Sequence, residues 1–492
     1  VVAGRFLQGV GGGGLIPATL ALVADLWPAD RRGLPLGVVG AFQELGSVLG
    51  PLYGAVVLLL ADWRMIFWLN LGGGLLLALC LRLRSARDEP SSGHSGRRPA
   101  HASPGDLPGL VLGVLTVVAI ALTLTTPDRL ASDVTLGLAF VPFAAGSRLA
   151  TPLGVATLVI AVLFVLRELS ARAPMVDLRR LPAVLRAADF PGATLLGLTL
   201  GGVIVAFAVA DPATEVLSPA GPWLLVGSAL CATAFVVRQR RTPDPVVPRG
   251  ALRARPAWGA LAVSFCTGAA LIAALVDVPL FARATRYPDS QLGAALVLVR
   301  FLVALPIGAL VGGWLTRRLS ASLLTAMGMA LSAGGFVAMT GWRLDALDGP
   351  VSSIALLVCG LGFGLAIAPV NAALLAATGS GHHGVASALL VVARMMGMLV
   401  GLSALTAVGL HRFFDRQARI RAPEVLCPDS PLRCPAYVHE LRDAALVQLH
   451  TIFAGAAVCA AAAGLLALAT FRRATASRQL ARSGMTDATE PT

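Results

Sequence analysis

The stretch GVVGAFQELGSVLGPLYG, residues 37–54, is the part of the sequence that decides the class of this protein. It is apolar and long enough to lie inside a bilayer, yet it carries Gln43, Glu44 and a Gly50-Pro51 step. A carboxylate at membrane depth is costly unless it is protonated, paired or facing a water-filled cavity. The stretch therefore predicts a helix that lines a transport pathway. The alternative is that Glu44 lies near a helix end, where its carboxylate reaches the membrane surface.

Three glycines on the same stretch, Gly46, Gly50 and Gly54, recur every four residues and share one helix face. A neighbouring helix can approach such a bare face closely. Pro51 frees a backbone carbonyl that hydrocarbon cannot satisfy. We therefore expect a second helix to pack against the three glycines.

Composition extends the membrane prediction to the whole chain. Of its 492 residues, 56% are hydrophobic and only 13% are charged, as in polytopic helical membrane proteins. The sequence contains about thirteen apolar segments, near residues 1–26, 34–60, 64–82, 107–125, 152–167, 190–210, 222–237, 257–281, 292–315, 322–340, 352–378, 384–410 and 449–471.

The net charge of +13 would suit a nucleic-acid-binding protein, but membrane topology explains it better. All 39 basic residues are Arg. If the first segment runs from outside to inside, 24 of them fall in cytoplasmic connections and about 12 in outer connections. This topology places the C-terminus in the cytoplasm and predicts no nucleic-acid partner. The remaining three, Arg5, Arg300 and Arg394, fall within helices.

The cysteines and histidines indicate no metal site. Five of the seven Cys lie in apolar segments, where Cys usually acts as a small core residue. Cys427 and Cys434 are seven residues apart in the last outer loop, so we expect a disulfide between them. His382 and His383 adjoin on a short turn without further ligands, and we interpret them as a solvated turn.

Three motifs in order resemble the major facilitator superfamily. GRFLQGVGGG (residues 4–13) resembles its fourth-helix motif, and residues 40–54 resemble the antiporter motif of its fifth helix. DWRMIFWLN (residues 62–70) resembles the start of the sixth helix in the fourteen-helix drug:proton antiporters. The resemblance implies an all-α polytopic fold of two lobes, which expose a midplane site to each side of the membrane in turn.

Longer strings are similar to the mycobacterial lipid exporters of this superfamily. That resemblance implies export of triacylglycerides and lipoglycans, a periplasmic lipoprotein as partner, the proton gradient as energy source, and no cofactor. The similar strings are ADLW (24–27), QELGSVLGPLYG (43–54), LVDVPLF (275–281), ALPIGALVGGW (304–314) and HGVASALLVVARMMGML (383–399).

The same resemblance predicts how the chain is divided. We expect about four helices between the lobes, two more than is usual, with 107–125 and 152–167 as the candidate insertion. The chain begins inside a helix without Met, so we expect a truncated or incorrectly chosen start that lacks family helices one to three. The expected parts are a partial N-terminal lobe (1–83), an inter-lobe linker (84–256), a C-terminal lobe with family helices seven to twelve (257–471) and a cytoplasmic tail (472–492).

The acidic candidates for substrate binding or proton coupling are Glu44, with Gln43 beside it, and Asp277. Glu44 projects from a helix that lines the cleft in the family. Asp277 lies near the end of its span, where a carboxylate that reaches the membrane surface would fit equally well.

The basic candidates are Arg residues that can hold a carboxylate ionised. Arg5 occupies a motif position that the resemblance links to proton transfer, and Gln8 shares its helix face. Arg394 could meet Glu44 across the cleft as a lock between the lobes.

Three further polar residues each allow two interpretations. Arg300 is either a structural pin near a helix end or a functional residue, and Asn70 and Asn371 either line the cavity or bond a neighbouring helix. GGWLTRRLS (residues 312–320) stands where the family repeats its cytoplasmic signature, but Thr316 replaces the usual Asp, so this copy is degenerate.

The sequence thus predicts proton-coupled export of hydrophobic substrates, lipids or lipophilic drugs, across the plasma membrane. Two alternatives are a multidrug:proton antiporter and a non-transporting remnant or membrane scaffold. An enzyme is not expected, because no nucleophile, acid-base pair or metal cluster has convincing spacing.

Overall fold

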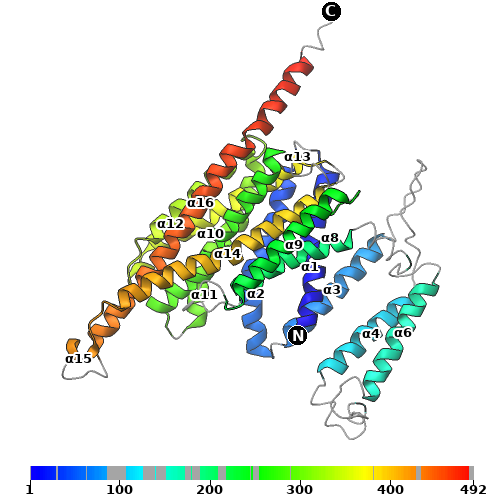
Figure 1. The fold of residues 1–492 in the computed structure, drawn as a ribbon, viewed down its shortest axis with the longest axis horizontal. Helices are drawn as coiled ribbons and strands as arrows, with labels where there is room; N and C mark the ends of the chain where they lie inside the picture. The colour runs from blue at the N-terminus through cyan, green and yellow to red at the C-terminus, as the bar shows by residue number, and fades with distance from the viewer. Residues whose placement is uncertain are drawn as a thin grey trace, which may run out of the picture. The chain divides into compact units, whose positions relative to one another are not determined.

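The described part of the chain is built from helices and contains no strand. The computed structural model describes residues 2–28, 31–62, 64–85, 107–125, 139, 151–171, 179, 189–208, 218–243, 245–247, 254–288, 290–379, 382–427 and 434–486. Its helices (Figure 1) are α1 (Val2–Leu26), α2 (Gly33–Leu60), α3 (Arg64–Ser85), α4 (Leu107–Thr125), α6 (Pro152–Ser170), α8 (Phe190–Ala208), α9 (Gly221–Arg241), α10 (Arg255–Thr285), α11 (Gln291–Leu315), α12 (Ala321–Met339), the short 3-10 helix η3 (Ala346–Asp348), α13 (Pro350–Ala377), α14 (His383–Gln417), α15 (Pro423–Leu426) and α16 (Pro435–Thr486).

Each of the thirteen predicted apolar segments corresponds to a helix, and side-chain caps fix several of the starts. The hydroxyl of Ser290 accepts a hydrogen bond from Gly293 N at 3.0 Å at the start of α11, and that of Ser320 accepts from Leu323 N at 3.3 Å at the start of α12. Eight helices among the described residues are long and apolar enough to cross a membrane. The prediction of an all-α polytopic membrane protein is confirmed.

The chain divides into two compact units. Unit 1 combines Val1–Ala55 with Pro191–Thr492, and unit 2 is Val56–Phe190. In unit 2, α4 and α6 form an antiparallel pair in which Thr123 and Thr157 share a hydrogen bond of 2.8 Å between their hydroxyls. The candidate insertion therefore forms a helix pair of its own.

The core of unit 1 is a bundle of α10, α11, α12, α13, α14 and α16. An aromatic cluster fills its interior: Phe336 lies 6.0 Å from Phe363 and 6.4 Å from Phe453, measured between ring centroids, and Trp342 lies 5.0 Å from Phe281. These rings bury a large apolar area, which positions the helices of the bundle.

Small residues let the α10 and α14 backbones touch. A Cβ atom added at Gly268 of α10 would collide with the carbonyl oxygen of Arg394, and one at Gly401 of α14 would lie 2.5 Å from the Cα of Ala269. This contact orients the stretch of α14 that carries Arg394.

One end of α1 and α2 packs tightly on the bundle. Leu20 and Val23 of α1 and Leu36 of α2 are buried with Ala368 and Leu375 of α13. Nearby, a Cβ atom at Gly37 would lie 2.8 Å from the Cα of Gly313, and one at Gly33 would overlap Thr316. We call this region, where Gly33 and Gly37 meet Gly313 and Thr316, the closed end of unit 1.

The other half of α2 lies differently from the expected arrangement. A Cβ atom at Gly46, Gly50 or Gly54 would have no described atom within 4 Å, and α2 continues as a helix through position 51. The close approach expected at these three glycines occurs instead at Gly33 and Gly37. In this conformation α2 contacts the bundle at one end and not along its glycine face, so a partner for that face stays a prediction.

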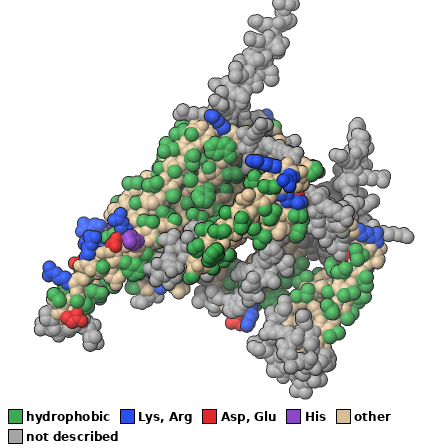
Figure 2. Space-filling view, in the orientation of Figure 1, with side chains coloured by type: hydrophobic (Ala, Val, Ile, Leu, Met, Phe, Trp, Pro, Cys, Tyr) green, Lys and Arg blue, Asp and Glu red, His purple; other side chains and the backbone are tan. Residues whose placement is uncertain are grey.

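Two helices run beyond the length that a bilayer requires. α14 has 35 residues and α16 has 52, so α14 alone spans about 52 Å against about 30 Å of hydrocarbon. Figure 1 shows α14 and α16 running together past the bundle to α15. The disulfide expected between Cys427 and Cys434 is present and closes this helical hairpin. Figure 2 shows hydrophobic side chains on the flanks of the helices and charged ones near the hairpin.

Candidate functional site

The centre of the candidate site is an ion pair between α2 and α14. Nη1 of Arg394 lies 3.1 Å from Oε1 of Glu44, and the two side chains are 13% and 6% exposed. The alternative interpretation, in which the Glu44 carboxylate reaches the membrane surface, is therefore wrong, because the side chain is buried in the protein. The structure brings together the two residues that were expected to meet.

The guanidinium of Arg394 is only partly satisfied. Its Nη2 atom is buried and has no hydrogen-bond partner among the described residues. A buried donor without a partner costs about 1–3 kcal/mol, and more when it is charged. Arg394 can therefore bind a further acceptor, such as a water molecule or an oxygen of a ligand.

A cavity of about 50 Å³ lies against the ion pair. This volume is large enough to hold water molecules beside the guanidinium of Arg394. Four helices besides α14 contribute to it, namely α1, α2, α10 and α13. Its lining consists of Ile16, Leu20, Gln43, Ser264, Thr267, Phe363, Ala366, Ile367, Val370, Asn371, Leu390, Val391, Arg394 and Met395.

The polar residues of the lining are mostly satisfied by backbone. Ser264 Oγ donates to Leu390 O at 3.1 Å, and Thr267 Oγ1 donates to Val263 O at 2.7 Å. Asn371 Nδ2 donates to Ile367 O at 2.9 Å, so Asn371 bonds its own helix although it also lines the cavity. The wall is therefore largely apolar apart from Gln43 and the ion pair.

Asp277 lies on α10, away from this cavity lining, and is only 2% exposed. The alternative of a carboxylate reaching the surface is therefore wrong for Asp277 as well. No hydrogen bond or ion pair to Asp277 occurs within the described part of the chain. The structure does not bring it to the Glu44–Arg394 pair, and its role stays a prediction.

The remaining predicted residues are scattered. Arg300 Nη1 donates to Ser353 Oγ at 2.8 Å and so connects α11 to α13, as a structural pin would. Asn70 on α3 is exposed and lies in unit 2. The side chains of Arg5 and Pro51 lie outside the described residues, and Gln8 is exposed on α1.

One interpretation of the sequence is wrong. His383 does not lie on a solvated turn: its side chain is 4% exposed and contacts Thr378 and Asp25. The turn is covered because α1 ends beside it, and no periodicity within residues 382–399 could show that. Ser264 and Thr267 were also missed, although their spacing of three residues places them on one face of α10.

Comparison with known proteins places these features in a family. Residues 1–237 match the family model described as Major Facilitator Superfamily. The chain is 33% identical to a triacylglyceride transporter of Mycolicibacterium smegmatis over 95% of this chain and 70% of that protein. It is 33% identical to a probable triacylglyceride transporter of Mycobacterium leprae over 95% of this chain and 76% of that protein.

A triacylglyceride transporter of Mycobacterium tuberculosis is 34% identical over 84% of this chain and 64% of that protein. The chain thus spans roughly two thirds of the length of these relatives. The resemblance seen in the three sequence motifs is confirmed. The chain belongs to the major facilitator superfamily and is an all-helical, multi-pass membrane protein.

Proposed function

We propose that the protein is a carrier, not an enzyme, that exports lipids of the triacylglyceride class across the plasma membrane by alternating access. The observation that carries the proposal is the buried Glu44–Arg394 pair beside a largely apolar cavity. Relatives that match nearly the whole chain are named as triacylglyceride transporters, which supports the choice of substrate. An apolar wall suits acyl chains, and the unpartnered Arg394 nitrogen suits an ester oxygen.

Proton coupling follows from the chemistry of the pair. Arg394 stays charged at any accessible pH, so the pair separates when Glu44 gains a proton. A protonated Glu44 no longer holds α14, and α2 can then move relative to the bundle. In this proposal a proton taken from the outer side breaks the contact, which makes the carrier a lipid:proton antiporter.

The conformation of unit 1 is consistent with one state of such a cycle. α1 and α2 contact the bundle at the closed end, whereas the glycine face of α2 has no described neighbour. The Arg distribution assigns the closed end to the cytoplasm, so this state would be open to the outside. The C-terminus would then also be cytoplasmic.

We propose a periplasmic lipoprotein as the acceptor of the lipid. A triacylglyceride cannot leave a membrane into water without a carrier. The hairpin of α14 and α16 extends past the bundle on the side opposite the closed end, where an acceptor would have to dock. Its end carries exposed charged residues, including Arg421 and Glu424.

The test is transfer of a fluorescent triacylglyceride from proteoliposomes to a lipid-binding acceptor protein outside them, under an imposed proton gradient. Glu44→Gln, which mimics a protonated carboxylate permanently, should abolish dependence on the gradient. The control, Asp345→Asn, changes an exposed carboxylate between α12 and α13 and should leave transfer unchanged. Gradient-dependent transfer that persists in Glu44→Gln would contradict the proposed coupling.

The same vesicles distinguish the alternative functions. Efflux of a lipophilic cation without lipid transfer would identify a multidrug:proton antiporter. Transport of neither substrate by the folded protein would identify a non-transporting remnant or scaffold.

A further inference from the structure

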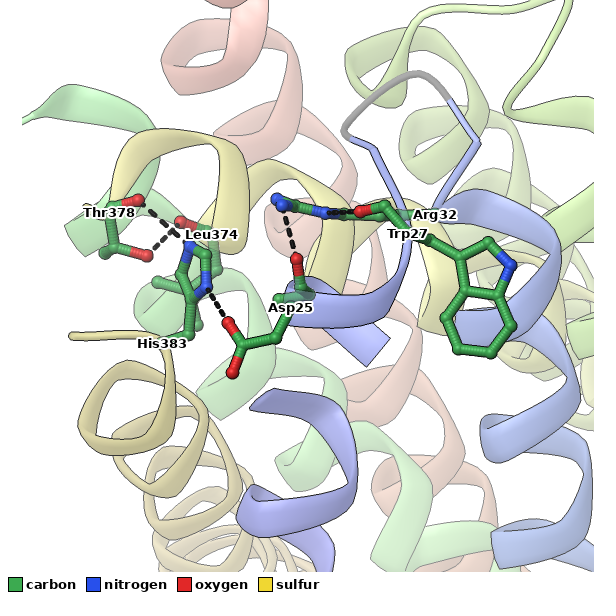
Figure 3. Close-up of polar contacts among 7 residues, drawn as sticks. Asp25, Trp27, Arg32, Leu374, Thr378 and His383 are labelled. Atoms are coloured by element: carbon green, nitrogen blue, oxygen red, sulfur yellow. Dashed lines mark hydrogen bonds and ion pairs between the residues drawn. The ribbon is translucent and has the colours of Figure 1, made fainter. Parts of the chain in front are cut away.

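A second polar cluster lies at the closed end of unit 1 and is separate from the cavity. It consists of Asp25 at the end of α1, Arg32 just before α2, Thr378 just after α13 and His383 at the start of α14 (Figure 3). It thus connects the two N-terminal helices to the bundle at the point where the buried Leu20, Val23 and Leu36 layer ends.

The contacts of His383 determine which of its ring nitrogens carries hydrogen. Nε2 lies 3.2 Å from the carbonyl oxygen of Thr378, and a carbonyl can only accept, so Nε2 is the donor. Nδ1 then points toward Asp25, with 3.8 Å between Nδ1 and Oδ1. Nδ1 is buried and has no hydrogen-bond partner among the described residues.

This geometry makes the contact depend on the charge of His383. In the neutral ring Nδ1 presents a lone pair to a carboxylate, and the two repel each other. In the protonated ring both nitrogens are donors, so Nδ1–H⁺ faces Asp25 and the contact becomes attractive. Histidine is the side chain whose charge changes between pH 5 and 8.

Arg32 fixes the end of α1, the part of the backbone that carries Asp25. The guanidinium donates to Ala24 O at 2.5 Å and to Trp27 O at 2.7 Å, which satisfies the last carbonyls of α1 and ties the end of α1 to the start of α2 (Figure 3). Asp25 therefore moves with both helices. Separation of α1 and α2 from the bundle must break its contact with His383.

Arg31 lies beside Arg32 in the α1–α2 turn, and further charged groups come from the elements packed at the closed end. Arg32 faces the cluster from α2, and α13 contributes the Thr378 carbonyl but no charged side chain among its described residues. His382 adjoins it on α14. Arg255 at the start of α10 and Arg317 and Arg318 after α11 lie at the same end of the bundle.

We propose that Asp25 and His383 form a proton-dependent latch that stabilises the conformation in which this end of the carrier is closed. The latch rests on the alternating access of the proposed function, and it adds a second proton-sensitive contact on the opposite side from the source of the driving proton. Acidity on the side of the closed end favours closure, and alkalinity releases it.

The test measures the distance across the closed end by electron paramagnetic resonance. Spin labels at Pro28→Cys and Arg317→Cys, both exposed positions, report the separation of the α1–α2 turn from the α11–α12 turn. The background lacks the free cysteines and carries Glu44→Gln, so that the central pair contributes no pH dependence. The labels are measured at pH 5.5 and at pH 8.5.

The ratio of closed to open molecules should be about two- to fivefold higher at pH 5.5, because an ion pair with Asp25 63% exposed contributes only modestly. His383→Gln keeps a donor for the Thr378 carbonyl but stays neutral, and it should remove this pH dependence. Asp25→Asn, at an exposed position, should do the same. His382→Gln is the matched control and should retain it.

Two results overturn the latch: a ratio that does not change with pH, and a pH dependence that survives in both His383→Gln and Asp25→Asn. A single distance under every condition, including added lipid, would instead contradict the alternating access of the proposed function, and the latch with it. If both distances are observed but the ratio of closed to open molecules does not change with pH, only the latch is contradicted.

Discussion

Removal of one partner of the Glu44–Arg394 pair should destabilise the protein more than removal of both. At 3.1 Å between Nη1 and Oε1 and an effective dielectric constant near 20, the gross attraction is about 5 kcal/mol. Breaking a buried ion pair by deleting one partner typically costs about 3–5 kcal/mol. For Arg394→Met we expect the free energy of unfolding to fall by about 3 kcal/mol, the lower limit of this range, because Glu44 can be protonated when its partner is gone.

The assay is equilibrium unfolding in mixed micelles for Arg394→Met, for Glu44→Gln and for the double variant. The double variant leaves no unpaired charge, so it should regain at least half of the free energy of unfolding lost in Arg394→Met. The coupling energy between the two sites should exceed about 1.5 kcal/mol, within the range for residues in contact.

Additive losses would refute the reasoning. If the double variant loses the sum of the two single losses within about 0.5 kcal/mol, the two side chains are not coupled and the pair does not hold α2 to α14. Glu424→Gln combined with Arg394→Met is the control and should be additive, since Glu424 is exposed on α15.

Two more predictions concern the two ends of the structure. Gly37→Val should lower the closed population about tenfold or more in the spin-label measurement, because its Cβ would lie 2.8 Å from the Cα of Gly313 and overpacking costs about 1–3 kcal/mol. Gly50→Val is the control and should change the closed population little, since a Cβ at Gly50 has no described atom within 4 Å. Equal effects of the two substitutions would contradict the contact between Gly37 and Gly313. Cys427→Ser should speed hydrogen exchange at the end of the hairpin and leave α10 to α13 protected, since a short disulfide loop contributes about 2–3 kcal/mol. Cys80→Ser, which removes a free cysteine, is the control. Unchanged hydrogen exchange at the hairpin in Cys427→Ser would contradict a stabilising role of the disulfide.

Much of the helix content could be predicted because long apolar runs have one stable form in a membrane. The contact of Glu44 with Arg394 was foreseen from chemistry, since a buried carboxylate needs a partner and few cations lie within spans. The disulfide was foreseen from a seven-residue spacing in an outer loop.

Tertiary packing set the limits of the prediction. The glycines at 46, 50 and 54 have the expected spacing, but contact depends on how far α2 lies from the bundle, which is a property of the conformation. His383 is buried because the end of α1 covers it, a contact between residues more than 350 positions apart. Such contacts leave no periodic signal in either segment.

The continuity of α14 has a mechanical consequence. One unbroken helix carries Arg394 at the ion pair and, 23 residues further on, Gln417 in the hairpin. That distance is about 35 Å at 1.5 Å per residue, so a tilt of about 10° around Arg394 would displace the far end by about 6 Å. In the proposed cycle the helix would therefore act as a lever arm, through which a small tilt at the buried pair produces a larger movement of the hairpin.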